Sequence, residues 1–318
     1  SAAAEAVLMA RRASKRTHTL LSSGLHPEYL ETIRAYVQGL DEEPSLDLVP
    51  MGADGRTDWD AAAGLVRDDT AAIVVGYPNF FGCVEDLAAV KTLAASTGAL
   101  LVTATAEPYA LSLLRPPGDY GADICVGEGQ PLAVPPQYGG PGVGLLGASQ
   151  KFVRQLPGRL VGRTLDADGR PGYVLTLSTR EQHIRRERAP SNICTNHGLI
   201  ALAFAIRTAM LGRRGFVETG QRCLDATHYL RARLADIPGL EFPYEAPVFN
   251  ELVVRFTHQR AKDVLDTLVA KDIVGGLDLG RIDEAFEHDL LVAVTELHSR
   301  QDLDRFAEEL RQALDGSA

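Results

Sequence analysis

The 318-residue sequence contains few cysteines and aromatic residues, and it has no long apolar run. The four cysteines are far apart and form no C-x-x-C pair, which argues against a disulfide framework or a zinc site. We interpret them as small core residues: Cys83, Cys125, Cys194 and Cys223. No stretch reaches the roughly 18 to 20 apolar residues of a membrane span, and the start lacks the features of a signal peptide. We therefore expect a cytoplasmic protein without a membrane partner.

The sequence also lacks an excess of positive charge. Its 32 Lys plus Arg residues against 42 Asp plus Glu residues give a net charge of -10. A protein that binds nucleic acid without regard to sequence needs a basic face, so this class is disfavoured. The eight histidines show no metal-ligand spacing, and no G-x-S-x-G elbow or Walker loop is present. We therefore predict no metal site. With 45% apolar and 23% charged residues, the chain is expected to fold into a globular protein.

The first 150 residues alternate between short apolar runs and helical patterns. Strands are predicted at 17–22, 46–50, 71–77, 99–104, 122–127 and 143–148, with helices at 27–40 and 84–97. This alternation is typical of an α/β fold, in which helices cover both faces of a mostly parallel sheet. Ligands of such sheets bind at the carboxyl ends of the strands.

The pattern changes in the last third of the chain. Thr195 or Asn196 can cap an apolar helix that Gly212 is expected to end. Further helices are predicted at 216–234, 261–271 and from Ser299 to about 314, with strands at 250–256 and 290–295. We therefore predict a large α/β domain over residues 1–212 and a smaller α+β domain over 213–318.

Two dense stretches carry a family resemblance. They are GADICVGEGQPL, followed by YGGPGVGLLGASQKFVRQLPGRLVGRT, and GYVLTLSTREQHIRRERAPSNICTN. With them the chain resembles subunit 1 of glycine dehydrogenase (decarboxylating), the P-protein of the glycine cleavage system. The resemblance implies the type I fold of pyridoxal-phosphate enzymes. It also implies a complex that decarboxylates glycine and passes the aminomethyl group to the lipoyl group of H protein.

The resemblance further implies that this subunit does not hold the cofactor. Gln130 stands where the cofactor-bearing subunit has its Schiff-base lysine, and Ala104 stands where that subunit has the aspartate that pairs with the pyridine nitrogen. A glutamine forms no imine, and an alanine cannot hold a ring nitrogen protonated. We therefore expect pyridoxal phosphate in a partner, glycine dehydrogenase subunit 2, and no cofactor in this chain.

An arginine-rich stretch is the first candidate for a functional site. Alternating charges at residues 180–188 are typical either of a solvated helical face with internal ion pairs or of a surface that lines the active site or a subunit interface. Both interpretations stay open. The candidate residues are Arg180, His183, Arg185, Arg186 and Asn192.

The glycines at 129, 139, 140 and 142 also allow two interpretations, a phosphate cradle or a tight turn. A phosphate loop normally leads into a helix, whereas this one leads into a strand pattern, so the turn is favoured.

One further expectation follows from the resemblance. Family members carry an N-terminal segment of more than a hundred residues before the part that matches here, so the large domain is expected to lack part of its rim. Two alternatives to the subunit role remain. One is a stand-alone pyridoxal-phosphate enzyme with a relocated lysine, and the other is a scaffold without a catalytic role.

Overall fold

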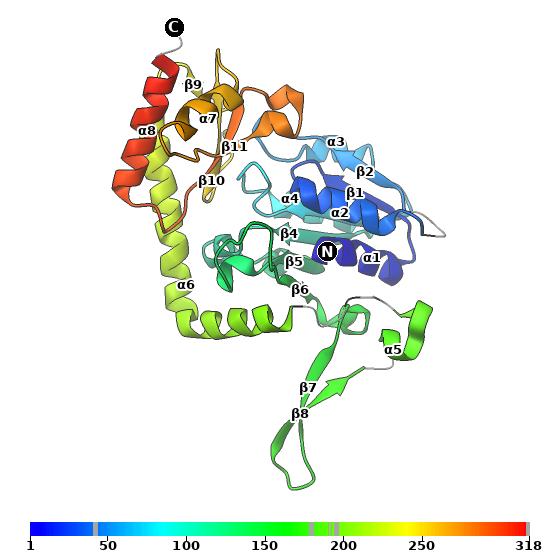
Figure 1. Ribbon diagram of the computed structural model, residues 1–318. Coiled ribbons are helices and arrows are strands. Elements are labelled where there is room, and N and C mark those ends of the chain that lie inside the picture. Colours follow the sequence, from blue (N-terminus) through cyan, green and yellow to red (C-terminus); the bar gives the residue numbers. More distant parts are fainter. Residues whose placement is uncertain (41–43, 178–180, 190, 192, 194–196, 316–318) are drawn as a thin grey trace.

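The structure is a computed structural model, and it describes residues 1–315 except 41–43, 178–180, 190, 192 and 194–196. Its larger part is built on a six-stranded sheet in the order β2-β1-β3-β4-β5-β6 (Figure 1). Strands β1 to β5 run parallel to one another, and β6 runs antiparallel to β5 at one edge of the sheet. The strands are β1 (His18–Ser22), β2 (Leu46–Val49), β3 (Thr70–Gly76), β4 (Leu100–Thr105), β5 (Ile124–Glu128) and β6 (Gly144–Ala148).

Helices cover both faces of this sheet. Helices α1 and α2 pack on one face against Val74 and Val102, and α3 and α4 pack on the other face against Ile73 and Leu101. Because successive residues of a strand point to opposite faces, the continuous apolar runs fill both cores. The helices are α1 (Ala2–Ser14), α2 (Pro27–Val37), α3 (Trp59–Ala63) and α4 (Leu87–Thr97). Short 3-10 helices are η1 (Pro108–Ser112), η2 (Pro117–Tyr120), η3 (Gln130–Leu132) and η4 (Gln150–Gln155).

The smaller part is an antiparallel sheet in the order β11-β12-β10-β9, covered by α6, α7 and α8. Its buried apolar cluster joins Leu230 of α6, Leu268 of α7 and Leu310 of α8. The elements are β9 (Leu240–Glu241), β10 (Glu251–Phe256), α7 (Ala261–Val269), β11 (Leu277–Asp278), η7 (Leu279–Arg281), η8 (Glu284–Phe286), β12 (Asp289–Ala293) and α8 (Arg300–Asp315). At the start of α8, Ser299 Oγ accepts from Asp302 N, and Ser299 N donates to Asp302 Oδ2, which is a capping box.

The helix α6 (Gly198–Leu234) connects the two parts and bends sharply at Gly212 (Figure 1). The prediction that Gly212 ends the helix is therefore only half right. Its backbone is not helical, with φ 60° and ψ 179°, but the helix resumes after it because Phe216 packs against Tyr109 of η1. The predicted division of the chain at residue 212 stays a prediction, since α6 spans that point.

A hairpin of β7 (Leu160–Leu165) and β8 (Pro171–Thr176) projects from the body of the protein (Figure 1). It is followed by the short helices α5 (Gln182–Arg185) and η6 (Arg186–Arg188). The sequence patterns did not predict this hairpin. No described helix is long and apolar enough to span a membrane.

Candidate functional site

A cavity of about 480 Å³ lies between the two parts of the protein, at the carboxyl ends of β1, β3 and β4. The larger part contributes the residues that follow these strands. The smaller part contributes Glu251 at the start of β10, the loop 274–277, and β12. The expectation that parallel strands end at a ligand cavity therefore fits the position of this cavity.

The chain positions this cavity with a tightly bonded loop after β3. Asn79 accepts from the backbone N–H groups of Phe81 and Cys83, while its amide donates to Gly55 O. Gly82 has a φ of +83°, and a Cβ atom on it would lie 2.0 Å from Glu251 O. Only glycine allows this conformation and this close approach. The loop therefore holds Glu251 against the ends of the parallel strands.

One wall of the cavity is aromatic. His26 lies 5.3 Å from Tyr29 and 5.1 Å from Phe80, measured between ring centroids. His26 Nδ1 accepts from Glu28 N at the start of α2. Burial lowers the pKa of His26, so its ring is neutral at pH 7. Burial also raises the pKa of Tyr29 to about 12, so its hydroxyl keeps its proton.

Two carboxyl groups face the same cavity. Glu107 follows β4, and its Oε1 accepts from Tyr109 N at 2.8 Å. Burial, and then the nearby charge of Glu107, raise the pKa of Glu251 to about 7. Burial is likewise the main cause that raises the pKa of Glu107. Among the described residues, none donates a hydrogen bond to the carboxylate of Glu251, and no lysine or arginine lines the cavity.

The glycine-rich loop that follows β5 is closed by a carboxylate of its own. Glu128 Oε1 accepts from Gln130 N at 2.8 Å and from Val143 N at 2.9 Å. A Cβ atom on Gly142 would lie 3.1 Å from Glu128 Oε2. Because Glu128 already uses these two backbone donors, the arrangement favours the turn interpretation over a phosphate cradle.

The residues do not fit pyridoxal phosphate held through a Schiff base. Gln130 is half-buried beside His26, and Ala104 is buried at the end of β4. All five lysines are described, and none lines the cavity. Lys91 and Lys151 pair with Asp123, Lys262 pairs with Asp266, Lys271 pairs with Glu309, and Lys15 caps α1. An imine needs an amine within reach of the cofactor.

The arginine-rich candidates lie elsewhere. His183, Arg185 and Arg186 are exposed on α5 and η6, next to the hairpin, and none of them lines the interdomain cavity. His183 Nδ1 lies 3.6 Å from Glu181 Oε2, and Arg159 Nε lies 3.2 Å from the same atom. Arg180 and Asn192 lie outside the described residues, as does Cys194. The role of these candidates stays a prediction.

Sequence reasoning missed the cavity residues His26, Tyr29, Phe80 and Glu251. Each is unremarkable alone, and only the position just after a predicted strand marks His26 as a candidate. Among the described residues, no group of three or more His, Cys, Asp or Glu side chains could hold a metal ion.

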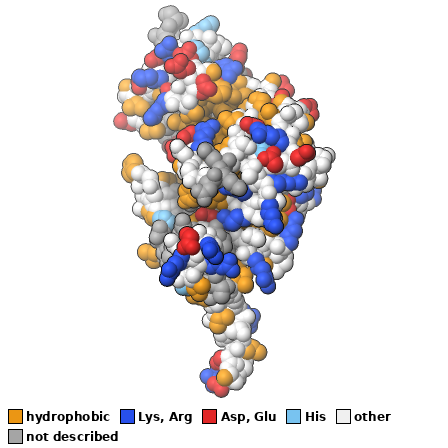
Figure 2. Space-filling view, turned by 90° about the vertical axis from the view of Figure 1, so that its right-hand side faces the viewer, with side chains coloured by type: hydrophobic (Ala, Val, Ile, Leu, Met, Phe, Trp, Pro, Cys, Tyr) orange, Lys and Arg blue, Asp and Glu red, His pale blue; other side chains and the backbone are white. Residues whose placement is uncertain are grey.

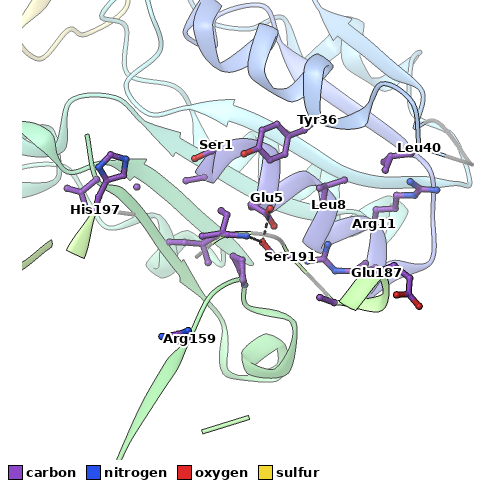
Figure 3. Close-up of a pocket in the computed structure, with 18 of the residues that line it drawn as sticks. Ser1, Glu5, Leu8, Arg11, Tyr36, Leu40, Arg159, Glu187, Ser191 and His197 are labelled. Carbon is purple, nitrogen blue, oxygen red and sulfur yellow. Dashed lines mark hydrogen bonds between the residues drawn. The ribbon is translucent and has the colours of Figure 1, made fainter. Parts of the chain in front are cut away.

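A groove runs along α1 beside β6, which is an edge strand of the sheet (Figure 3). Ser191 Oγ donates to Glu5 Oε1 within it at 2.9 Å. Burial raises the pKa of Glu5 and lowers that of Arg12, whose Nε and Nη2 atoms are buried without a partner among the described residues. Basic side chains gather on this face of the larger part, above the hairpin (Figure 2).

The first arm of α6 exposes an apolar stripe. Leu199, Leu202, Ile206 and Met210 are 77%, 56%, 53% and 83% exposed. Their spacing of three and four residues places them along one side of the helix. The hairpin is also apolar outside, with Tyr173 73% exposed. Contiguous exposed apolar side chains of this kind mark an interaction surface.

Comparisons with known proteins give the family. A family described as "Glycine cleavage system P-protein" matches residues 1–310. The relative from Sorangium cellulosum, named "Probable glycine dehydrogenase (decarboxylating) subunit 1", is 53% identical over 308 residues, which are 96% of this chain and 68% of the relative. A relative of the same name from Geobacillus kaustophilus is 44% identical over 310 residues, which are 98% of this chain and 68% of the relative.

Comparison with solved structures supports the same family. The crystal structure of a glycine decarboxylase (P-protein) in inhibitor-bound form superimposes with a TM-score of 0.91 at 40% identity, over 98% of this chain and 69% of that one. A sphingosine-1-phosphate lyase from Burkholderia pseudomallei gives a TM-score of 0.70 at 17% identity, over 99% of this chain and 68% of that one, which shows the fold alone.

Proposed function

Because the chain belongs to the glycine cleavage system P-protein family, we propose that it works as subunit 1 of a glycine dehydrogenase (decarboxylating). In this role it joins a subunit 2 that carries pyridoxal phosphate. The complex decarboxylates glycine and transfers the aminomethyl group to the lipoyl group of H protein.

The observation that carries this proposal is the apolar stripe on the first arm of α6. A chain that works alone rarely exposes four large apolar residues in one row. Burial of each such side chain stabilises an interface by about 1.5–3 kcal/mol, so the stripe alone supplies a substantial part of the binding free energy of a stable complex. We assign this stripe to the contact with subunit 2.

The groove beside α1 is the second proposed contact with that partner. Two of its donors, Nε and Nη2 of Arg12, are buried without a hydrogen-bond acceptor among the described residues, although the charge of Glu5 acts on the same guanidinium. Buried donors without an acceptor are costly, and a carboxylate or backbone carbonyl of the partner would satisfy them. The exposed His183, Arg185 and Arg186, together with Arg180 and Asn192, are proposed to extend this surface.

Co-expression with a candidate subunit 2 tests the proposal. We expect the two chains to co-purify, and we expect release of CO2 from glycine only when both chains, pyridoxal phosphate and lipoylated H protein are present. Release of CO2 by this chain with the cofactor and H protein, but without subunit 2, would overturn the assignment. It would favour the stand-alone alternative, in which a lysine is relocated.

A pair of matched variants tests the contact itself. Leu202→Asp changes a residue of the stripe that is 56% exposed, and Val269→Asp changes a residue of α7 that is 57% exposed. We expect the first variant to weaken complex formation at least tenfold and the second to leave it unchanged. Equal behaviour of the two variants would show that the stripe is not part of the interface.

In the reconstituted complex, the triple truncation Arg180→Ala, His183→Ala and Arg186→Ala distinguishes a catalytic contribution of these residues from a scaffold role. If the chain is only a scaffold, the kinetics of glycine decarboxylation by the reconstituted complex should not change.

A further inference from the structure

We propose that the interdomain cavity binds a small organic cation, an amine or quaternary ammonium without a carboxylate, between Glu107, Glu251 and the aromatic wall. The aromatic wall consists of His26, Tyr29 and Phe80. This inference concerns binding by the chain itself and does not depend on the proposed role in glycine decarboxylation.

The charge of the lining argues for a cation. Among the described residues that line the cavity, two carry a carboxyl group and none is a lysine or an arginine. Glu107 Oε1 accepts from Tyr109 N, whereas the carboxylate of Glu251 receives no hydrogen bond from any described residue. Glu251 is half-buried, so its carboxylate is only partly hydrated, and an ammonium group placed beside it would supply the missing partner.

The aromatic wall argues for an organic cation instead of a metal ion. The ring centroids of Tyr29 and Phe80 both lie within 5.5 Å of that of His26, so the three rings form one continuous surface. The face of an aromatic ring attracts an alkylammonium group by about 0.5–2 kcal/mol. A metal ion would need several oxygen or nitrogen ligands, and the described residues hold no group of three that could bind one.

The size of the cavity fits a small molecule. About 480 Å³ lies within the range of about 300–1,000 Å³ that is typical of ligand sites. The cavity is also held in place, because the apolar cluster of Phe81, Val253, Leu279 and Leu291 joins the two parts of the protein next to it. A preformed site loses little conformational entropy when it binds a ligand.

The same charges select against glycine and against anions. A zwitterion would bring its own carboxylate close to Glu107 and Glu251, and repulsion between like charges would cancel the gain from its ammonium group. The proposed ligand is therefore chemically distinct from the amino acid that the complex decarboxylates.

Binding should depend on pH. The titratable groups that face the cavity are Glu107, Glu251, His26 and Tyr29, and Glu296 acts on Glu107 from the smaller part. Since the pKa of Glu251 is about 7, its charged form predominates at pH 8.5 and is scarce at pH 5.5. We expect the affinity to fall by about 30-fold between these pH values.

Calorimetric titration of the purified full chain tests the proposal. The probes are tetramethylammonium and 1,4-diaminobutane, both as chlorides at constant ionic strength, with glycine as the discriminating ligand. We expect saturable binding of at least one amine at pH 8.5 and binding of glycine that is at least tenfold weaker. Absence of saturable binding by both amines, or glycine binding as tight as theirs, would overturn the proposal.

Variants locate the site. Glu251→Gln and Glu107→Gln each remove one charge from the cavity, and Glu245→Gln removes one from an exposed loop. We expect at least tenfold weaker amine binding in the first two and unchanged binding in the third, with circular dichroism to show that each variant folds. Unchanged binding in both cavity variants would place the amine elsewhere and refute the proposal. Neither result depends on a decarboxylation assay, so failure of the proposed function remains distinguishable.

Discussion

Replacement of Glu251 by glutamine should stabilise the protein, although it replaces a native, half-buried side chain of the cavity wall. Burial and the charge of Glu107 raise the pKa of this carboxyl from its ordinary value of 4.5 to about 7. One pKa unit corresponds to about 1.4 kcal/mol, so ionised Glu251 reduces the free energy of unfolding by about 3 kcal/mol. Glutamine has nearly the same shape and resembles the protonated acid, which does not carry this cost.

The dependence on pH gives the sign of the effect. Below pH 4.5 the carboxyl is protonated in both the folded and the unfolded chain, so Glu251→Gln should change nothing. Between pH 4.5 and about 7 the unfolded chain binds fewer protons than the folded one, so the stability of the wild type falls as the pH rises. Above about pH 7 the variant should keep a constant advantage of about 3 kcal/mol.

Urea unfolding at pH 4.5, 6 and 8.5 measures this difference. Glu245→Gln is the matched control, because Glu245 is exposed and its replacement changes the net charge equally. A variant that is less stable than the wild type at pH 8.5, or whose advantage is the same at all three pH values, would refute the reasoning about Glu251. The same variant is the one used for amine binding, so its stability excludes unfolding as the cause of lost affinity.

Four further changes test the packing and the charges of the fold. Gly220→Ala should destabilise the protein by about 1–3 kcal/mol in urea unfolding, because the new Cβ atom would lie 1.9 Å from Ser112 Oγ. Gly215→Ala meets only a flexible leucine in the same helix and should be neutral or stabilise by up to about 1 kcal/mol. Asp123→Asn should cost about 1.5–3 kcal/mol at pH 7. Two lysines and Leu101 N outweigh burial and lower the pKa of Asp123, so this cost should shrink as the pH falls below about 4. Ser299→Ala removes the cap of α8 and should lower the midpoint of unfolding by an amount equal to about 1 kcal/mol.

The sheet of the larger part could be predicted from the sequence because its strands are short runs rich in apolar residues. All six predicted strands correspond to β1 to β6, with ends that differ by at most two residues. The apolar run is longest in β3, which lies inside the sheet and is buried over its whole length, whereas the edge strands β2 and β6 are partly exposed. The hairpin β7–β8 was missed for the opposite reason. Its apolar residues are exposed and pack on no core of this chain, so burial gave no pattern to detect.

The candidate site could be predicted only in part. The sequence placed Gln130 and Ala104 near the ends of β5 and β4, and the structure puts them there. It did not indicate that Glu107 and Glu251 face the same cavity, since 144 positions of sequence separate them and only the packing of the two parts brings them together. The arginine-rich stretch was a candidate site because of its charge density. Charge density is a local property of the sequence and does not define a cavity.

Three separate features of the larger part favour the same division of labour between subunits. Gln130 offers no amine, Ala104 offers no carboxylate, and Glu128 already occupies the backbone donors of Gln130 and Val143. The first two features concern the imine and the ring of the cofactor. A single substitution such as Gln130→Lys would therefore supply an amine and still leave the ring nitrogen without a carboxylate.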